Sequence, residues 1–299
     1  MKNTMTTPAR LTTGIPALDQ HLGGGLLPGT LTLVVGATGI GKTQLGLQFG
    51  HAGKAQEGKT GIIFDMTSRG DSQSQAEYAR RMFDWQLRAV AADQKPNFEG
   101  FFDPARDHGD YLHVFDYHGR RVTRNDLDED AWRLWQSEVI TRLGVSIGFF
   151  YGNFVTGVRR AVIDGLEPAD RPGDSIQLQL FDYIYHQILR KDPDWVARDL
   201  FRQDFRRNAE AVAQHPYDPS KIACMVLYTS QETMLDDLIS RPLEEGGLEA
   251  GANTIILMGK IRDGNRIGRG LYIAKHRGSA CSEEIIPYSI DDRGLQLSK

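Results

Sequence analysis

Residues 36–43 have the sequence Gly36-Ala37-Thr38-Gly39-Ile40-Gly41-Lys42-Thr43, which matches the phosphate-binding pattern G-x-x-x-x-G-K-[ST] at every position. The apolar, β-branched run 31–35 before it predicts a buried strand, and the proline-free segment 43–49 after it predicts a helix. Glycines let backbone amides turn inward around a phosphate, and the helix N-terminus adds positive potential. The strand, loop and helix together predict a nucleoside triphosphate site.

Within this loop each residue type has an expected role. Lys42 would reach the β- and γ-phosphates, and the Thr43 hydroxyl would ligate Mg²⁺. The residues expected to surround the nucleotide are Gly36, Ala37, Thr38, Gly39, Ile40, Gly41, Lys42, Thr43 and Gln44.

Composition favours an ordinary globular protein: 299 residues, 40% hydrophobic and 25% charged, with a net charge of −4. Such a charge does not attract nucleic acid or an anionic membrane. Two cysteines make no disulfide framework and suit a reducing interior. The polar N-terminus lacks a signal-peptide core, and the most apolar window, 143–158, is too short to span a bilayer. We expect a cytoplasmic protein in which this window is a buried helix or leads into a strand.

Two later strands are expected to end in carboxylates. The segment 60–64 is followed by Asp65, and the apolar run from Val158 ends in Asp164. Buried parallel strands present such residues at the edge where a ligand binds, so Asp164 would hold Mg²⁺ through a water. Asp65 has an alternative, purely structural role as a cap of a strand-to-loop turn. Glu167 is expected in a surface turn, with a role at the metal or the water left open.

The sequence supports other candidate functional residues less well. A metal site built on histidines and aspartates is disfavoured, because on one strand His113 and His118 would point to opposite faces. The residues involved are His108, His113, His118, Asp107, Asp110 and Asp116. The remaining expected elements are a short helix at 18–19, a strand at 111–117, a helix capped near Asn125 and Asp128, helices at 176–189 and 195–212, and strands at 221–228, 252–259 and 269–276.

Several segments resemble the KaiC-like branch of the RecA superfamily. Residues 13–29 follow T-G-I-x-x-L-D-x-x-L-G-G-G-L-x-x-G, and residues 79–87 resemble a later family helix with its tail. The run Lys275-His276-Arg277-Gly278-Ser279 resembles the family's K-x-R-G segment. Length alone leans towards two domains. The resemblance instead implies a tail at 1–10 and one RecA-like α/β domain at 11–299, with a mostly parallel twisted sheet, helices on both faces and a C-terminal β-hairpin. The middle segments, about 88–110 and 169–220, are longer than in the family.

The resemblance also implies an activity. ATP and Mg²⁺ would be the ligands, and Asp65 would orient the attacking water at a position where the family usually has Glu, often Glu-Glu. Gln231 would sense the γ-phosphate. Lys275 and Arg277, which share one strand face by the period of two, would reach the γ-phosphate bound by a neighbouring subunit of a hexamer-like homo-oligomeric ring. A further protein partner is expected.

The predicted function is therefore a Mg²⁺-dependent ATPase acting as an oligomeric nucleotide-driven switch. One alternative is a DNA recombinase or helicase-like motor, which the six acidic residues and single basic residue of 229–251 disfavour. Another is a nucleotide-sensing scaffold with little turnover, since Met66 follows Asp65 where the family often has a second acid. Autophosphorylation would need an acceptor residue that the sequence does not identify.

Overall fold

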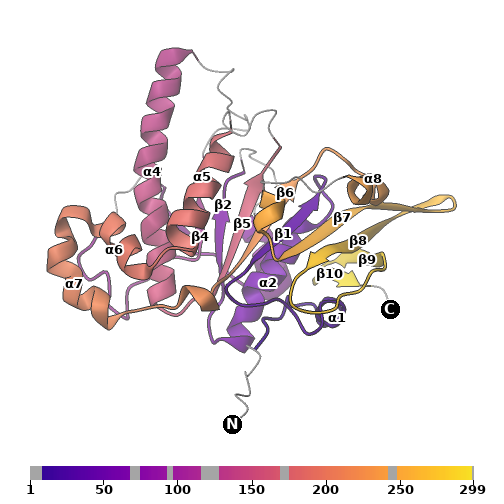
Figure 1. Ribbon diagram of the computed structural model, residues 1–299, viewed down its shortest axis with the longest axis horizontal. Helices are drawn as coiled ribbons and strands as arrows, with labels where there is room; N and C mark the ends of the chain where they lie inside the picture. The colour runs from indigo at the N-terminus through magenta and orange to yellow at the C-terminus, as the bar shows by residue number, and fades with distance from the viewer. Residues whose placement is uncertain are drawn as a thin grey trace, which may run out of the picture.

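One sheet runs through the protein (Figure 1). The computed structural model describes residues 9–67, 75–92, 97–115, 128–168, 175–241 and 248–297. Within them the strand order is β10-β9-β8-β7-β1-β6-β5-β2-β4-β3. The strands are β1 Leu31–Gly36, β2 Ile62–Asp65, β3 Ala89–Val90, β4 Tyr111–His113, β5 Arg160–Leu166, β6 Ala223–Thr229, β7 Thr254–Asp263, β8 Arg266–His276, β9 Ile286–Asp291 and β10 Gly294–Leu297.

The seven strands from β7 to β3 pair in parallel, whereas β8, β9 and β10 add antiparallel strands at one side. Every residue of β1, β2 and β5 is buried. A sheet covered on both faces needs such continuous apolar strands, which explains the lack of polar alternation in this part of the sequence.

Helices cover both faces of the sheet. Alternate residues of β1 separate two cores: Val34 packs with Leu45 of α2, and Leu33 packs in the cluster that holds Phe150 of α4. The helices are α1 Pro16–His21, α2 Lys42–Gln56, α3 Gln75–Phe83, α4 Glu129–Val155, α5 Ile176–Ile184, α6 Pro193–Phe201, α7 Phe205–Gln214, α8 Leu235–Ser240 and α9 Leu248–Gly251. The predicted α/β class, with its mostly parallel sheet and C-terminal antiparallel strands, is confirmed.

The enlarged middle of the chain forms the end of the molecule away from the C-terminal strands (Figure 1). The apolar window 143–158 is the buried end of α4, as predicted. The single helix expected at 195–212 is wrong, because a 3₁₀ turn at Arg202–Asp204 separates α6 from α7. Arg202 has φ +48°, outside the helical range, so the chain changes direction there.

Two strand boundaries also differ from expectation. The strand predicted at 111–117 ends at His113, and positions 116–117, like Asn125 and His118, lie outside the described residues. In the other direction, β5 continues past Asp164, where the strand was expected to end, through Gly165 and Leu166, both buried.

A buried ion pair joins the start of β5 to the end of α2. Arg160 is wholly buried, and its guanidinium donates to both carboxylate oxygens of Glu57 at 2.8 Å. The same group also donates to the backbone oxygens of Thr12 and Phe49. A buried arginine is tolerated when its donors are satisfied in this way. The pair fixes α2, which carries the P-loop at its other end.

Candidate functional site

The P-loop connects β1 to α2 at the carboxyl edge of the parallel strands. Gly41 has φ +112°, and a Cβ added there would lie 2.6 Å from the Ile290 side chain, so only glycine fits. The exposed part of the loop is Thr38 and Gly39. Of the remaining predicted positions, Gln44 is half-buried on the first turn of α2, whereas Gly36, Ala37, Ile40 and Gly41 are buried. The loop therefore offers its central residues to a ligand and anchors both ends.

Lys42 is folded back onto the loop. Its buried Nζ donates to the carbonyl oxygens of Gly36 at 2.8 Å and Ala37 at 2.9 Å. Burial lowers the pKa of Lys42 to about 8, opposed by the charges of Asp164 and Glu167. Both carboxylates thus lie close enough to act on this ammonium group, and a phosphate would add to the same attraction.

The two predicted metal ligands are in contact. The Thr43 hydroxyl donates to Asp164 Oδ2 at 3.0 Å, although 121 residues separate them in sequence. Gln75 Nε2 donates to the same oxygen at 3.0 Å. Burial, followed by repulsion from Asp65, raises the pKa of Asp164 to about 6. Hydroxyl and carboxylate oxygens are the hard donors that Mg²⁺ prefers, so these side chains fit the expected ion.

Asp65 lies beside Asp164, its register partner on the neighbouring strand β5. Its Oδ2 accepts a hydrogen bond from the Tyr111 hydroxyl at 2.7 Å, and its Oδ1 accepts one from Thr67 N at 2.8 Å. These bonds fit the structural role of a strand-end cap and also fix the carboxylate in place. A carboxylate has about four lone-pair sites, so room for a water remains. This geometry is compatible with both the strand-end cap and the positioning of a water by Asp65.

At the end of β6, Ser230 lies closer to the P-loop than the predicted Gln231. Ser230 N donates to the Gly36 carbonyl at 3.0 Å, and the buried Ser230 hydroxyl bonds the Glu232 carboxylate. Gln231 is exposed. Ser230 therefore contacts both the start of the P-loop and the segment after β6.

Lys275 and Arg277 lie far from the P-loop of their own chain. Gly36 is level with Met258 of β7, which is level with Leu271 of β8. From there β8 runs away from the nucleotide edge, and a bulge leaves Lys275 level with Ile255, three residues before Met258, so Lys275 is displaced by about 10 Å at about 3.4 Å per residue. Lys275 Nζ donates to the Glu249 carbonyl of α9 at 2.8 Å, whereas the His276 ring faces the Leu22 carbonyl on the other side. The predicted opposite orientation of Lys275 and His276 is confirmed.

Sequence reasoning missed Gln75, Tyr111 and Ser230. Each acts through a contact with a residue distant in the chain, and none stands in a pattern that marks it. Of the histidines, His113 bonds the Thr67 carbonyl at 2.9 Å, and His108 lies at the opposite edge of the sheet.

In the parts of the chain that the structure describes, no helix combines the length and apolar character needed to cross a bilayer.

A P-loop between β1 and α2, beside a strand-end aspartate on a mostly parallel sheet, is the arrangement of a nucleotide-binding site on a RecA-like α/β fold. Residues 11–111 match the family model of the KaiC ATPase, so this part of the chain is KaiC-like.

Individual relatives agree with this assignment. An 87-residue segment is 35% identical to the circadian clock oscillator protein KaiC of Rippkaea orientalis, covering 29% of this chain and 16% of that protein. The KaiC of Acaryochloris marina is 32% identical over 87 residues. A 50-residue segment is 46% identical to the DNA repair protein RadA of Mycobacterium tuberculosis, covering 17% of this chain and 10% of RadA. The chain thus matches only a small part of each relative's length.

Proposed function

We propose that the protein hydrolyses ATP with Mg²⁺ and works as a head-to-tail homo-oligomer, a nucleotide-driven switch. The observation that carries the proposal is the contact between Thr43 and Asp164 beside the buried ammonium of Lys42. It unites phosphate-binding and metal-binding groups from two distant segments at one edge of the sheet.

In this proposal Lys42 exchanges its two loop carbonyls for phosphate oxygens. Thr43 and Asp164 would hold the metal, which would neutralise charge on the β- and γ-phosphates. Asp65, oriented by Tyr111 and Thr67, positions the water for in-line attack. Glu167 is the second candidate for that role, because its charge already acts on Lys42.

The cations at the end of β8 are assigned to the neighbouring subunit's nucleotide. Their displacement from their own P-loop supports this assignment, since a lysine side chain cannot span it. Arg277 is exposed just after β8, and the charge of Arg277, after burial, contributes to the lowered pKa of Lys275. Two adjacent cations at a subunit boundary would stabilise charge that develops on the γ-phosphate.

Mixing two inactive variants tests the proposal. Lys42→Ala subunits cannot bind nucleotide but keep their cations, and Lys275→Ala/Arg277→Ala subunits bind nucleotide but lack them. In a closed assembly of identical interfaces mixed 1:1, about a quarter of the interfaces pair an intact P-loop with intact cations. Phosphate release should therefore recover to about a quarter of the wild-type rate. Mixed assemblies that form but stay inactive would refute the action in trans.

A second candidate function, a nucleic-acid-dependent motor, is favoured by one feature. The β7–β8 hairpin projects from the sheet (Figure 1) and exposes four cations: Lys260, Arg262, Arg266 and Arg269. None of the four forms an ion pair among the residues that the structure describes. The similarity to a DNA repair protein points the same way. We expect weak DNA binding at physiological salt, because the net charge is −4. A submicromolar, ATP-dependent affinity for duplex or single-stranded DNA would favour the motor instead.

A further inference from the structure

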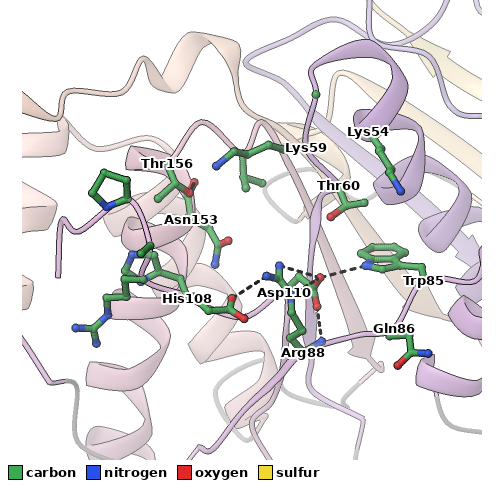
Figure 2. A pocket seen from close by; sticks show the side chains of 16 residues that line it. Lys54, Lys59, Thr60, Trp85, Gln86, Arg88, His108, Asp110, Asn153 and Thr156 are labelled. Carbon is green, nitrogen blue, oxygen red and sulfur yellow. Dashed lines mark hydrogen bonds and ion pairs between the residues drawn. The ribbon is translucent and has the colours of Figure 1, made fainter. Parts of the chain in front are cut away.

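A cavity of about 520 Å³ lies at the amino edge of the parallel strands, opposite the P-loop (Figure 2). Its walls include Thr60, just before β2, Asp110, just before β4, and Val158, shortly before β5. Arg88, residues 104–108 and Asp110 close one side, and the C-terminal ends of α2 and α4 close others. This cavity has no part in the nucleotide site described above.

Cations outnumber carboxylates in the cavity. Arg88 is neutralised, because it pairs with Asp107 at 2.9 Å and Asp110 at 3.2 Å. The oxygens of Asp110 are also occupied by Trp85 Nε1 at 3.1 Å and by Arg88 N at 2.6 Å. Figure 2 shows this network at the floor of the cavity. Neither carboxylate is therefore available to neutralise a further cation.

Three further cations line the same space. Arg106 donates to the backbone carbonyls of Glu99 and Asn97, both at 2.7 Å, so its charge is solvated but not neutralised. Lys54 and Lys59 are exposed at the rim, and no ion pair holds them among the residues that the structure describes. Figure 2 shows the Lys59 side chain extending over the cavity towards Asn153 and Thr156.

The helix ends reduce this positive charge without cancelling it. Each C-terminus contributes about −0.5 of an elementary charge, so α2 and α4 together contribute about −1. Four cations and two carboxylates give +2 before that correction, from Lys54, Lys59, Arg88 and Arg106 against Asp107 and Asp110. A positive charge of about +1 remains in a partly desolvated space. Such a space favours an anion.

His108 supplies an independent observation that points to a polar ligand in this cavity. Its Nε2 is buried without a hydrogen-bond partner in the described structure, and an unpaired buried polar atom is costly. Burial, followed by the charge of Arg106, lowers the pKa of His108 to about 4, so the ring is neutral at physiological pH. A neutral imidazole can donate to or accept from a polar ligand as its tautomer requires.

We propose that this cavity binds a small phosphate-bearing molecule. Lysine and arginine groups that line one cavity without carboxylate partners suit a phosphate with its several acceptor oxygens. The volume exceeds that of inorganic phosphate and falls in the range of organic ligand sites, so the phosphate is carried on an organic group. The site is separate from the P-loop and does not depend on ATP hydrolysis.

Binding is tested on Lys42→Ala protein, so that the P-loop contributes little. Calorimetric titration with AMP, pyrophosphate and citrate separates an organic phosphate, a bare phosphate and a polycarboxylate. We expect AMP and pyrophosphate to bind, with citrate at least tenfold weaker. Adding Lys54→Ala and Lys59→Ala should weaken phosphate binding at least tenfold, whereas Lys260→Ala, an exposed lysine on the β7–β8 hairpin, should change it less than twofold.

Three results would overturn the assignment: no binding of AMP at millimolar concentration, equal binding of citrate, or unchanged affinity in the double-lysine variant. Thermal unfolding of each variant verifies that these exposed substitutions leave the fold intact. A second measurement keeps the proposal separate from ATPase function. With Lys42 intact, Lys54→Ala/Lys59→Ala should bind and turn over ATP as wild type does, whichever way the cavity experiment ends.

Discussion

The two edges of the parallel sheet are built differently. At the carboxyl edge, one continuous loop supplies most of the predicted nucleotide contacts, and Asp164 and Asp65 join it from the ends of neighbouring strands. At the amino edge, the cavity is assembled from α2, the segment 85–110 and the end of α4. A site made by one short segment leaves a pattern in the sequence, whereas a site assembled from distant segments does not.

Charge differs between the edges as well. At the nucleotide edge Lys42 is buried among carboxylates that act on it, and each group has a partner. At the amino edge Lys54 and Lys59 are exposed at the rim of a cavity whose two carboxylates are already engaged. The first arrangement is prepared for a ligand together with a metal, and the second favours an anion alone.

The helix α2 allows the sharpest comparison, because it carries Lys42 at its first residue and Lys54 in its last turn. Lys42→Ala should weaken ATP binding by about a hundredfold or more, since losing a buried charged hydrogen-bond partner costs about 2–5 kcal/mol. Lys54→Ala should change ATP affinity less than about twofold, as exposed charges contribute little. Calorimetric titration with ATP·Mg²⁺ measures both. Similar losses in the two variants would show that the edges do not have separate roles.

The next largest effect is expected within the nucleotide edge. Asp65→Asn should lower turnover by about a hundredfold, the scale of a positioned general base, with the Kd for ATP unchanged. Glu167→Gln serves as the control, since its charge also acts on Lys42. Steady-state phosphate release decides between them. A larger loss in Glu167→Gln than in Asp65→Asn would move water positioning to Glu167 and leave Asp65 as a structural cap.

Much of the nucleotide edge could be predicted from sequence because its signals are local. The apolar run, the glycine pattern and the following helix are contiguous, and the strand that ends in Asp164 shows the continuous apolar character of a buried parallel strand. Other features depend on packing. Arg160 is buried inside such a strand because distant groups, among them Glu57, 103 residues away, accept its hydrogen bonds, and the contact of Gln75 with Asp164 spans 89 residues. The helix break at Arg202 likewise has no glycine or proline to mark it.

A pH profile compares the two titrating groups of the nucleotide edge. Burial, with repulsion from Asp65, raises the pKa of Asp164 from 3.8 to about 6, so protonation below about pH 6 removes the charge that holds the metal. Burial lowers the pKa of Lys42 from 10.5 to about 8, so its charge is lost above about pH 8. The kcat/KM for ATP should therefore be highest between these values and fall about tenfold per pH unit outside them.

The alkaline limb can be assigned with one variant. Lys42→Arg keeps its charge at every accessible pH, so any residual activity should lose the decline above pH 8. A decline that persists in Lys42→Arg would assign this limb to another group. A wild-type profile that is flat from pH 5 to pH 7 would contradict the role of Asp164.

The smallest loss of turnover is predicted for Tyr111, which lies between the two edges. Tyr111 follows Asp110 of the cavity directly, yet its hydroxyl reaches Asp65 Oδ2 at 2.7 Å. Tyr111→Phe keeps the ring and removes only this donor. A single hydrogen bond contributes about 1 kcal/mol, which corresponds to about fivefold, so kcat should fall by about that factor. Because Tyr111 contacts Asp65 and not the P-loop, the KM for ATP should stay unchanged. If Tyr111→Phe lowered only the thermal stability and left kcat intact, the Tyr111–Asp65 hydrogen bond would have a structural role. It would then not connect the amino edge to catalysis at the carboxyl edge.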